Sequence, residues 1–373
     1  MSALAAEMAA RALQLGIPLS AQLDLTYRCN ERCVHCYLDH RDHGEMATAE
    51  ILDLLDQMAA AGVFYLTLSG GEILMRKDFF EILEHARALT FCIKLKTNGV
   101  LIRAPQAGRI RALGVESVQI SIYSHRPETH DAITKMPGSL RQSIRAARLL
   151  RERGVRVIFA SVLMRQNARD YSGVKALAAE LGAQFILDPT ITPMMDGDRS
   201  ILELNVDEEA LREVFRNEGL VGNAEEFCAP PQGPDADALD CLPCSAGHTA
   251  CYVSPYGDVY PCVQFPLPSG NVRCTKFAEI WRHSPQLNDV RSITLRDMPS
   301  CSLCAHGGTC TRCPGLAYLE GNMRGPSSQD CEKSFARTGI ASENLLAKKA
   351  APQLRPPSQL IQIQSLPQAV NSE

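Results

Sequence analysis

The stretch Cys29-Asn30-Glu31-Arg32-Cys33-Val34-His35-Cys36 brings three thiols together within eight residues, at a C-x3-C-x2-C spacing. Directly before it, apolar and polar residues alternate from Leu23 to Tyr27, a pattern typical of a strand. We therefore expect the three sulfurs on a loop that leaves the end of a strand.

Three thiolates are one fewer than a closed metal site needs. Structural zinc takes four protein ligands, and a fully protein-ligated 4Fe-4S cluster takes four cysteines. A three-cysteine loop suits a cluster with one open iron, to which a small molecule can bind. Spacing alone leaves other readings open, because His35 could supply a fourth ligand and the cysteines could bind structural zinc or no metal.

The composition bounds the class of protein. At 373 residues, the chain is long enough for two domains, or for one barrel with a smaller module. Its net charge of -4 gives no general attraction to nucleic acid or anionic membranes. No run of eighteen apolar residues and no signal peptide is present, so we expect a cytoplasmic protein whose partner is a small molecule or a peptide. In such a chain, fifteen cysteines indicate metal binding rather than disulfides.

Strands and helices alternate after the cysteine loop. This order predicts an α/β fold with a parallel sheet wound into a partial (β/α)6 TIM-like barrel, in which chemistry lies at the carboxyl ends of the strands. The predicted strands are 23–27, 63–68, 92–96, 117–122, 155–163 and 183–187, and the predicted helices are 48–61, 77–89, 105–113, 140–153 and 171–181.

The rest of the chain changes composition twice. Segment 191–240 is rich in proline, glycine and acidic residues, with one helix expected near 207–217, and segment 241–331 holds ten cysteines in 91 residues. A piece with so little apolar core needs metal clusters to hold it together. We therefore divide the chain into an N-terminal extension (1–19), a barrel (20–190), a bridge (191–240), a cysteine-rich domain (241–341) and a disordered or loosely attached tail (342–373).

Two further motifs follow predicted strands. Ser69-Gly70-Gly71-Glu72 follows the second strand, where paired glycines allow close approach of the backbone to a ligand. Thr97-Asn98-Gly99 and Ser121-Ile122-Tyr123-Ser124 end the third and fourth strands. Each motif alone is also compatible with an ordinary turn.

Taken with the cysteine loop, these motifs resemble those of the radical S-adenosylmethionine superfamily. The resemblance implies that Cys29, Cys33 and Cys36 bind a 4Fe-4S cluster whose open iron is chelated by S-adenosylmethionine, which is cleaved to a 5′-deoxyadenosyl radical. It also implies cosubstrate contacts, with Gly70, Gly71 and Glu72 at the methionine amino group, Asn98 and Ser121 at the ribose and carboxylate, and Tyr37 near the adenine. The family often has proline after the glutamate, where this chain has Ile73, and an arginine after a His-Asp pair, where Lys135 could substitute.

The cysteine-rich domain resembles the SPASM extension of the same superfamily. The matching features are Gly257-Asp-Val-Tyr-Pro-Cys262, Gly270-Asn271 with Ile280-Trp281, and the late cysteine run. The resemblance implies two auxiliary 4Fe-4S clusters, whereas the domain alone would equally suit two four-cysteine zinc sites. The implied ligands are Cys244, Cys251, Cys262 and Cys313 for one cluster and Cys301, Cys304, Cys310 and Cys331 for the other. Cys241 competes with Cys244 for the first position.

The resemblance predicts an oxidoreductase that abstracts hydrogen from a ribosomally made peptide and forms a crosslink or a related modification. Formylglycine formation, as in sulfatase-maturing enzymes, is an alternative, but Val263 stands where those enzymes have an aspartate. Modification of a small molecule is another, and a zinc-stabilised binding module is the non-enzyme alternative. The first predicted strand begins at Leu23, so we expect no leader-binding domain before it. Leader recognition, if the substrate requires it, then comes from a separate leader-binding protein or from the barrel itself, and we expect an electron donor such as flavodoxin or ferredoxin.

Overall fold

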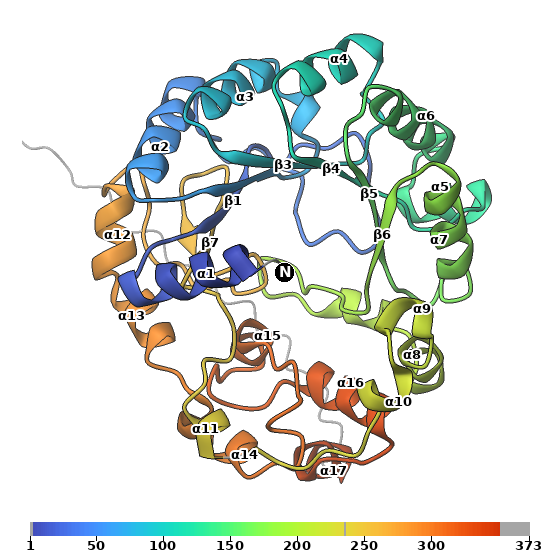
Figure 1. Ribbon diagram of the computed structural model, residues 1–373, viewed down its shortest axis with the longest axis vertical. Helices are drawn as coiled ribbons and strands as arrows, with labels where there is room; N and C mark the ends of the chain where they lie inside the picture. The colour runs from blue at the N-terminus through green and yellow to red at the C-terminus, as the bar shows by residue number, and fades with distance from the viewer. Residues whose placement is uncertain (1–2, 235, 351–373) are drawn as a thin grey trace, which may run out of the picture.

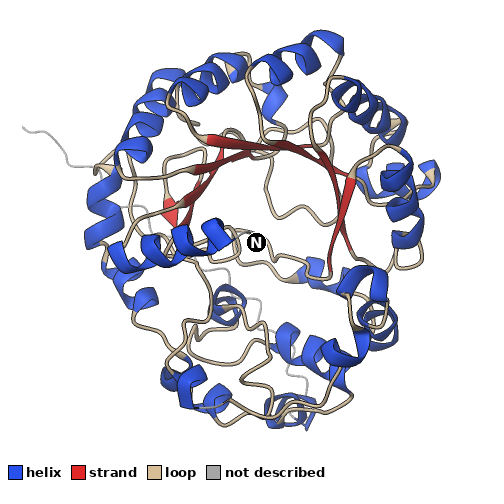
Figure 2. Cartoon of the chain, in the orientation of Figure 1, coloured by secondary structure: helices blue, strands red, loops and turns tan. Residues whose placement is uncertain are grey.

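The computed structural model describes residues 3–234 and 236–350, and its centre is one curved eight-stranded sheet (Figures 1 and 2). The strand order is β6-β5-β4-β3-β2-β1-β7-β8, with every pair parallel except β7 and β8. The strands are β1 Ser20–Asp24, β2 Tyr65–Ser69, β3 Cys92–Thr97, β4 Ser117–Ser121, β5 Val157–Val162, β6 Gln184–Asp188, β7 Ala250–Val253 and β8 Val259–Tyr260. The predicted partial α/β barrel is confirmed.

Strand β7 is the main departure from the predicted sheet. Four consecutive residues from Ala250 to Val253 pair with Ser20 to Leu23 of β1, so a strand from the cysteine-rich part of the chain extends the barrel. Six strands were expected, because a four-residue segment far along the chain carries no local sign that it joins a sheet begun at Ser20. This pairing attaches the C-terminal part of the chain directly to β1.

Helices cover the convex face of the sheet (Figures 1 and 2). The alternating residues of each strand decide which side chains meet them, because successive side chains point to opposite faces. Leu23, Leu66, Leu95 and Ile120 face outward and are fully buried against the helices. The covering helices are α2 Thr48–Ala60, α3 Phe79–Ala88, α4 Ala104–Ala112, α5 Pro127–Thr134, α6 Ser139–Glu152 and α7 Tyr171–Glu180, and α1 Ala3–Leu15 precedes β1.

The bounds of helix α2 depend both on its local sequence and on tertiary contacts. It buries Ile51, Leu54, Leu55 and Met58 at the expected helical spacing and ends before Gly62, whose φ of 95° suits glycine. Its N-cap, however, is Ala47 rather than Thr48 as expected. The Thr48 hydroxyl instead donates a 2.7 Å hydrogen bond to Asp78, which belongs to the loop after β2.

The C-terminal half contains more helix than the sequence indicates. Most helices of the bridge and the cysteine-rich part lie below the barrel in Figure 1, whereas α12 lies beside it and packs against α2. The helices of this half are α8 Glu208–Phe215, α9 Glu218–Val221, α10 Ala224–Phe227, α11 Ala236–Leu239, α12 Phe277–His283, α13 Pro285–Arg291, α14 Pro299–Ser302, α15 Pro314–Leu319, α16 Ser328–Thr338 and α17 Glu343–Ala350, with 3-10 turns η2 Ser200–Leu204 and η3 Leu295–Asp297. A further 3-10 turn, η1 Ile73–Met75, lies in the loop after β2.

The expected tail is partly wrong. Helix α17 occupies Glu343–Ala350, where a disordered or loose segment was predicted, and Leu345 is buried because the helix packs against α16. The remainder of the predicted tail, 351–373, lies outside the described residues. Within the described part of the chain, no helix is both long and apolar enough to span a membrane.

Candidate active site and cluster-binding cysteines

The three-cysteine loop leaves the carboxyl end of β1, as predicted, and its thiols are half-buried. The backbone amide of Glu31 lies 3.4 Å from the Cys29 sulfur, and the Cys36 amide donates to the Cys33 carbonyl oxygen. Two hydrogen bonds to helix α5, from Arg32 and Val34 to the carbonyls of Thr134 and Ile133, hold the loop from the other side. The loop is therefore fixed at both flanks while its sulfurs face inward.

The donor set of this loop fits a metal cluster. Burial raises the pKa of Cys29 to about 12 and that of Cys36 to about 11, so the bare thiols are protonated at neutral pH. A thiolate there needs a nearby positive centre, which a bound cluster supplies. Glu31 Oε1 and His35 Nδ1 are also buried beside the cysteines with no hydrogen-bond partner. Unsatisfied buried polar atoms are costly, so they support a polar occupant at this position.

Gly70 and Gly71 pack directly against the segment that leads into the cysteine loop. A Cβ on either glycine would collide with the backbone of Thr26, Tyr27 or Arg28, and Gly70 has a φ of 132° that other residues rarely adopt. The Gly71 amide donates to the Thr26 carbonyl at 2.7 Å and the Glu72 amide to the Arg28 carbonyl at 2.9 Å. The glycines therefore bring the two loops together, and the Gly71 and Glu72 amides bond to backbone carbonyls of the other loop.

The Glu72 carboxylate is fully buried and joins the ends of two strands. It accepts hydrogen bonds from the Thr97 hydroxyl at 2.8 Å and the Asn98 amide at 2.9 Å, and from the Leu74 amide at 3.1 Å. The Asn98 side chain in turn points at the cysteine loop, with its Nδ2 3.9 Å from Cys29 Sγ and 2.9 Å from Asn30 Oδ1. Glu72 thus positions Asn98 as a hydrogen-bond donor to a predicted cluster ligand.

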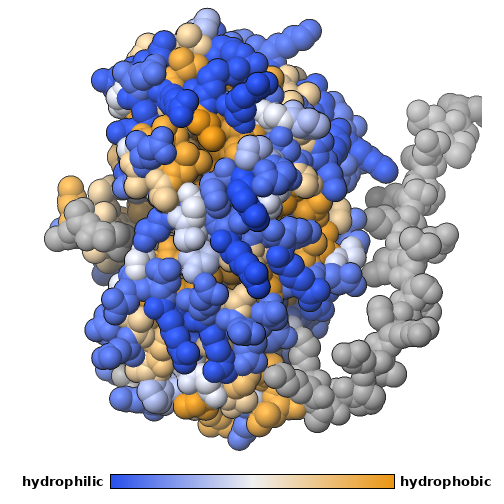
Figure 3. All heavy atoms as spheres, turned by 90° about the vertical axis from the view of Figure 1, so that its right-hand side faces the viewer, coloured by the Kyte–Doolittle hydropathy of each residue, from blue (hydrophilic) through white to orange (hydrophobic). Residues whose placement is uncertain are grey.

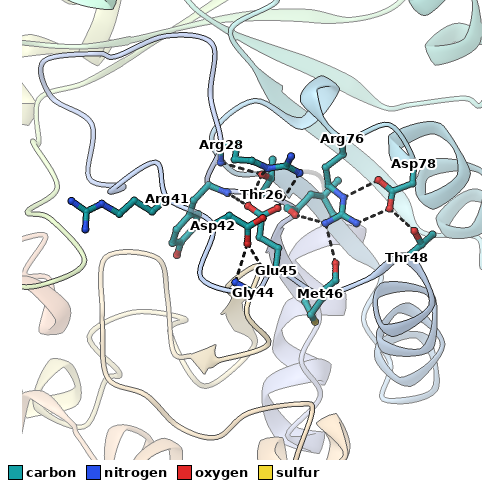
Figure 4. A network of polar contacts seen from close by, with 12 residues as sticks. Thr26, Arg28, Arg41, Asp42, Gly44, Glu45, Met46, Thr48, Arg76 and Asp78 are labelled. Atoms are coloured by element: carbon teal, nitrogen blue, oxygen red, sulfur yellow. Dashed lines mark hydrogen bonds and ion pairs between the residues drawn. The ribbon is translucent and has the colours of Figure 1, made fainter. Parts of the chain in front are cut away.

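A second brace, which the sequence did not indicate, lies behind the loop (Figure 4). The buried Arg76 guanidinium donates to the carbonyls of Leu25 and Met46, at 3.0 and 3.1 Å, and forms an ion pair with Asp78. Glu45 accepts from the Thr26 hydroxyl at 2.6 Å and the Tyr27 amide at 2.9 Å. These contacts clamp the residues before Cys29 against the residues after Cys36. No spacing rule links them, because the partners come from three separate loops.

Polar side chains meet on the concave face of the sheet, inside the barrel. Tyr252 of β7 donates to Asp24 of β1 at 3.0 Å, and its hydroxyl lies 2.6 Å from that of Tyr27. Gln22 bonds Asp24 at 3.1 Å and accepts from Lys96 of β3 at 2.9 Å. The sequence analysis missed this network, although Gln22 and Asp24 alternate with buried apolar residues. In a barrel strand, such polar residues can only face the lumen.

Asp24 carries an electrostatic cost. Burial raises its pKa from 3.8 to about 6, while hydrogen bonds from Gln22 and Tyr252 oppose the rise. Because the folded protein binds this proton more tightly than the unfolded chain, Asp24 makes the protein less stable as the pH rises through the interval between these two values.

Asp24→Asn is therefore expected to stabilise the protein more at alkaline than at acidic pH. The free energy of unfolding of the variant, minus that of the wild type, should increase by about 1 kcal/mol from pH 5 to pH 8, since one pKa unit corresponds to about 1.4 kcal/mol. Thermal unfolding of the anaerobically purified protein across this range measures the difference. A difference independent of pH would show that Asp24 is not the titrating group.

The remaining predicted cosubstrate residues, Ser121 and Tyr37, also belong to the segments at or after the carboxyl ends of strands, here β4 and β1. Ser121 ends β4 and by alternation faces the lumen, and Tyr37 follows the loop, with burial and then the Asp24 carboxylate raising its pKa. His130 and Asp131 are structural, because His130 Nδ1 accepts from the Tyr123 amide and Asp131 accepts from the first turn of α6. Lys135, beyond them, is exposed.

The first predicted auxiliary quartet lines one cavity of about 590 Å³ beside β1 and β7. The quartet consists of Cys244, Cys251, Cys262 and Cys313, and Gln22 of the lumen network lines the same cavity. Cys310, a member of the second predicted quartet, lines this cavity as well as the other one. Burial raises the pKa of Cys251 to about 12 and that of Cys313 to about 11. This quartet therefore lies next to the barrel interior, at the strand that joins the two halves of the chain.

The second predicted quartet lines a separate cavity of about 250 Å³, farther from the barrel. Its members are Cys301, Cys304, Cys310 and Cys331. Cys241 lines this cavity rather than the first, so the structure separates it from Cys244, with which it competed in sequence. Arg312 also lines it, with its Nη1 buried and unpartnered.

These groups do not converge as ligands of single ions. In the described ranges, no three side chains of His, Cys, Asp or Glu are close enough to share one metal ion. A 4Fe-4S cluster contacts its cysteines through separate irons, so its ligands surround a larger volume. The two cavities have the donor chemistry for such clusters.

Comparisons with known proteins agree with this arrangement. The family model of the radical SAM superfamily matches residues 23–176, and that of the SPASM iron-sulfur cluster-binding domain matches residues 244–314. PqqA peptide cyclase of Xanthomonas campestris pv. campestris is 33% identical over 341 residues, covering 87% of this chain and 89% of the relative. The chain is a radical SAM enzyme with a SPASM domain. Its cofactors are accordingly a 4Fe-4S cluster, S-adenosylmethionine and auxiliary iron-sulfur clusters.

Other relatives of this radical SAM/SPASM enzyme have different names. Mycofactocin maturase MftC of Mycobacterium ulcerans is 29% identical, covering 88% of this chain and 92% of the relative. An AdoMet-dependent heme synthase of Oleidesulfovibrio alaskensis is also 29% identical, covering 83% of this chain and 86% of the relative. Streptococcus suis SuiB, solved with its precursor peptide SuiA, shares the fold with a TM-score of 0.70 at 17% identity, over 88% of this chain and 79% of SuiB.

Proposed function

We propose that this enzyme cleaves S-adenosylmethionine reductively and abstracts hydrogen from a ribosomally made peptide, giving a crosslink or a related modification. The observation that carries the proposal is the convergence of the three-cysteine loop, Asn98 and Glu72 at the carboxyl ends of β1, β2 and β3, above a polar lumen. The peptide relative and the peptide-bound neighbour support the substrate class.

The proposed ligand sets follow the geometry described above. Cys29, Cys33 and Cys36 hold the first cluster and leave one iron to S-adenosylmethionine, whose cleavage supplies a 5′-deoxyadenosyl radical. We assign one cluster to each auxiliary quartet, since the members of each quartet line a common cavity, with Cys310 lining both cavities. We also assign 20–190 to the barrel and 241–341 to the SPASM domain, with 191–240 as the bridge between them.

The chain's own residues then have separate tasks. Asn98 donates a hydrogen bond to the Cys29 sulfur, and Glu72 holds Asn98 in place. Ser121 and Tyr37 border the opening where the cosubstrate binds. Inside the lumen, Asp24 can accept a proton near neutral pH, because its pKa is about 6. A modification that removes hydrogen from the substrate must release such a proton.

A small molecule is the second candidate substrate, since a heme synthase is among the relatives. One experiment separates the two. The enzyme is coproduced with candidate short peptides taken from the reading frames beside its gene. It is expected to convert one of them to a product lacking two hydrogens, located by tandem mass spectrometry. The control is the variant with alanine at Cys29, Cys33 and Cys36, which should leave the peptide unchanged. An unmodified peptide with the active enzyme would contradict the proposal and favour the small molecule.

A further inference from the structure

A group of arginines on helices α4 and α6 has no carboxylate to balance it. Arg103 precedes α4, and Arg141 and Arg145 lie four residues apart on α6, so they share one face of that helix. The two helices pack side by side (Figure 1). None of the ion pairs among the described residues includes these three arginines, whereas nearby Arg109 and Arg156 pair with Glu84 and Glu116.

The three arginines repel one another. Desolvation, and then the charges of Arg103 and Arg141, lower the pKa of Arg145, and its Nε and Nη2 have no hydrogen-bond partner. Like charges at such spacing reduce stability. The protein as a whole is acidic, with a net charge of -4. These three cations reduce the stability of a protein that is acidic as a whole. They therefore indicate a surface that binds a negatively charged partner.

Helix α6, which carries Arg141 and Arg145 of the arginine face formed with Arg103, is connected to the cysteine loop through Asn98. Ser143, on the opposite side of α6, donates to the Asn98 carbonyl at 2.6 Å, and the Asn98 side chain reaches the Cys29 sulfur. The path from the face to a predicted cluster ligand crosses helix α6, about 10 Å wide, then the Ser143–Asn98 hydrogen bond, the Asn98 residue, and the 3.9 Å contact from Asn98 Nδ2 to Cys29 Sγ. Lys135 and Arg32, both exposed, extend the positive charge along the loop that covers Cys29. Strongly hydrophilic side chains also gather at the top of the molecule in Figure 3.

We propose that the arginine face is the docking site for an acidic one-electron carrier protein that reduces the cluster held by Cys29, Cys33 and Cys36. Charge complementarity selects the partner, and the path through Ser143 and Asn98 connects the docking site to the cluster ligand Cys29. In the transfer, the carrier is oxidised by one electron and the cluster is reduced by one electron, with no bond made or broken. The inference rests on the proposed reductive cleavage but not on the peptide, because cleavage can be measured without one.

The test compares two double variants with the same change in charge. Arg103→Glu with Arg141→Glu reverses the arginine face. Arg111→Glu with Arg148→Glu reverses two exposed arginines on the same helices, farther from Asn98. Each protein releases 5′-deoxyadenosine from S-adenosylmethionine, driven either by dithionite or by flavodoxin with its reductase and NADPH. The affinity for oxidised flavodoxin is measured separately at low and high salt.

The first variant is expected to lose at least tenfold in the flavodoxin-driven rate and in flavodoxin affinity, with its dithionite-driven rate unchanged. The second should match the wild type within twofold in all assays. Wild-type affinity should fall as salt rises, because exposed charges are screened. Equal losses in both variants, unchanged flavodoxin affinity in the first, or no salt-dependent binding to the wild type would each overturn the docking site. A failure of peptide modification alone would overturn only the proposed substrate.

Discussion

Alanine at Cys29, Cys33 and Cys36 together is expected to leave a protein that releases no measurable 5′-deoxyadenosine. The reason is chemical, since these three thiolates are the proposed ligands of the cluster whose fourth iron binds S-adenosylmethionine. The other cysteine of the barrel, Cys92, lies in β3 and not in this loop. The iron content should fall by the iron of one 4Fe-4S cluster. Iron analysis measures this loss, and anaerobic assays with dithionite measure the release of 5′-deoxyadenosine.

The matched control removes cysteines from the far cavity. Alanine at Cys301 and Cys331 should also lower the iron content, while S-adenosylmethionine is still cleaved, because that cavity lies away from the barrel opening. Loss of product formation without loss of cleavage would assign the second quartet to a later step. Release of 5′-deoxyadenosine by the triple-alanine protein after iron-sulfur reconstitution would refute the assignment of the first cluster.

Glu72→Ala is expected to be the most destabilising single change in the site. Three buried donors, the Thr97 hydroxyl and the amides of Asn98 and Leu74, would lose their acceptor. Each buried donor left unpaired costs about 1–3 kcal/mol. Thermal unfolding should shift accordingly, and S-adenosylmethionine cleavage should fall because Asn98 is released from the Cys29 sulfur.

Glu72→Gln separates this role from a cosubstrate contact. Its amide keeps one acceptor oxygen, so we expect partial recovery of both thermal stability and cleavage. If Glu72 acted only on bound S-adenosylmethionine, Glu72→Ala would raise the KM for S-adenosylmethionine and leave the unfolding temperature unchanged. That outcome would contradict the bracing role given to it here.

Much of the barrel could be predicted because its signals are local. Each strand from β2 to β6 is a short apolar run bounded by turn residues, and each helix has its own apolar stripe, so the elements fall within a few residues of their predicted bounds. Helix α8, Glu208–Phe215, was expected near 207–217, but helix α5 and the other short helices of the C-terminal half were missed. Their bounds depend on packing and capping contacts rather than on a long periodic pattern.

The candidate site divides in the same way. Cysteine spacing alone brought out the three-cysteine loop and the late cysteine run, because ligands that are also close in sequence leave a recognisable spacing. The partition of the auxiliary cysteines rested on resemblance and stays a prediction: the members of each quartet line a common cavity, but Cys310 lines both cavities. The braces Arg76 and Glu45 had no sequence signal, since their partners lie on other loops.

By itself, the sequence determined the alternation of strands and helices, the three-thiol loop at the end of β1 and the polar residues that follow β2, β3 and β4. These features depend on residues close together in the chain. Only the tertiary structure decided that β7 completes the sheet, that Tyr252 meets Asp24 in the lumen, and that Glu72 bonds protein groups. The physical reason is that hydrogen bonds and buried charges depend on partners which folding brings together from distant parts of the chain, as with Tyr252 and Asp24, 228 residues apart.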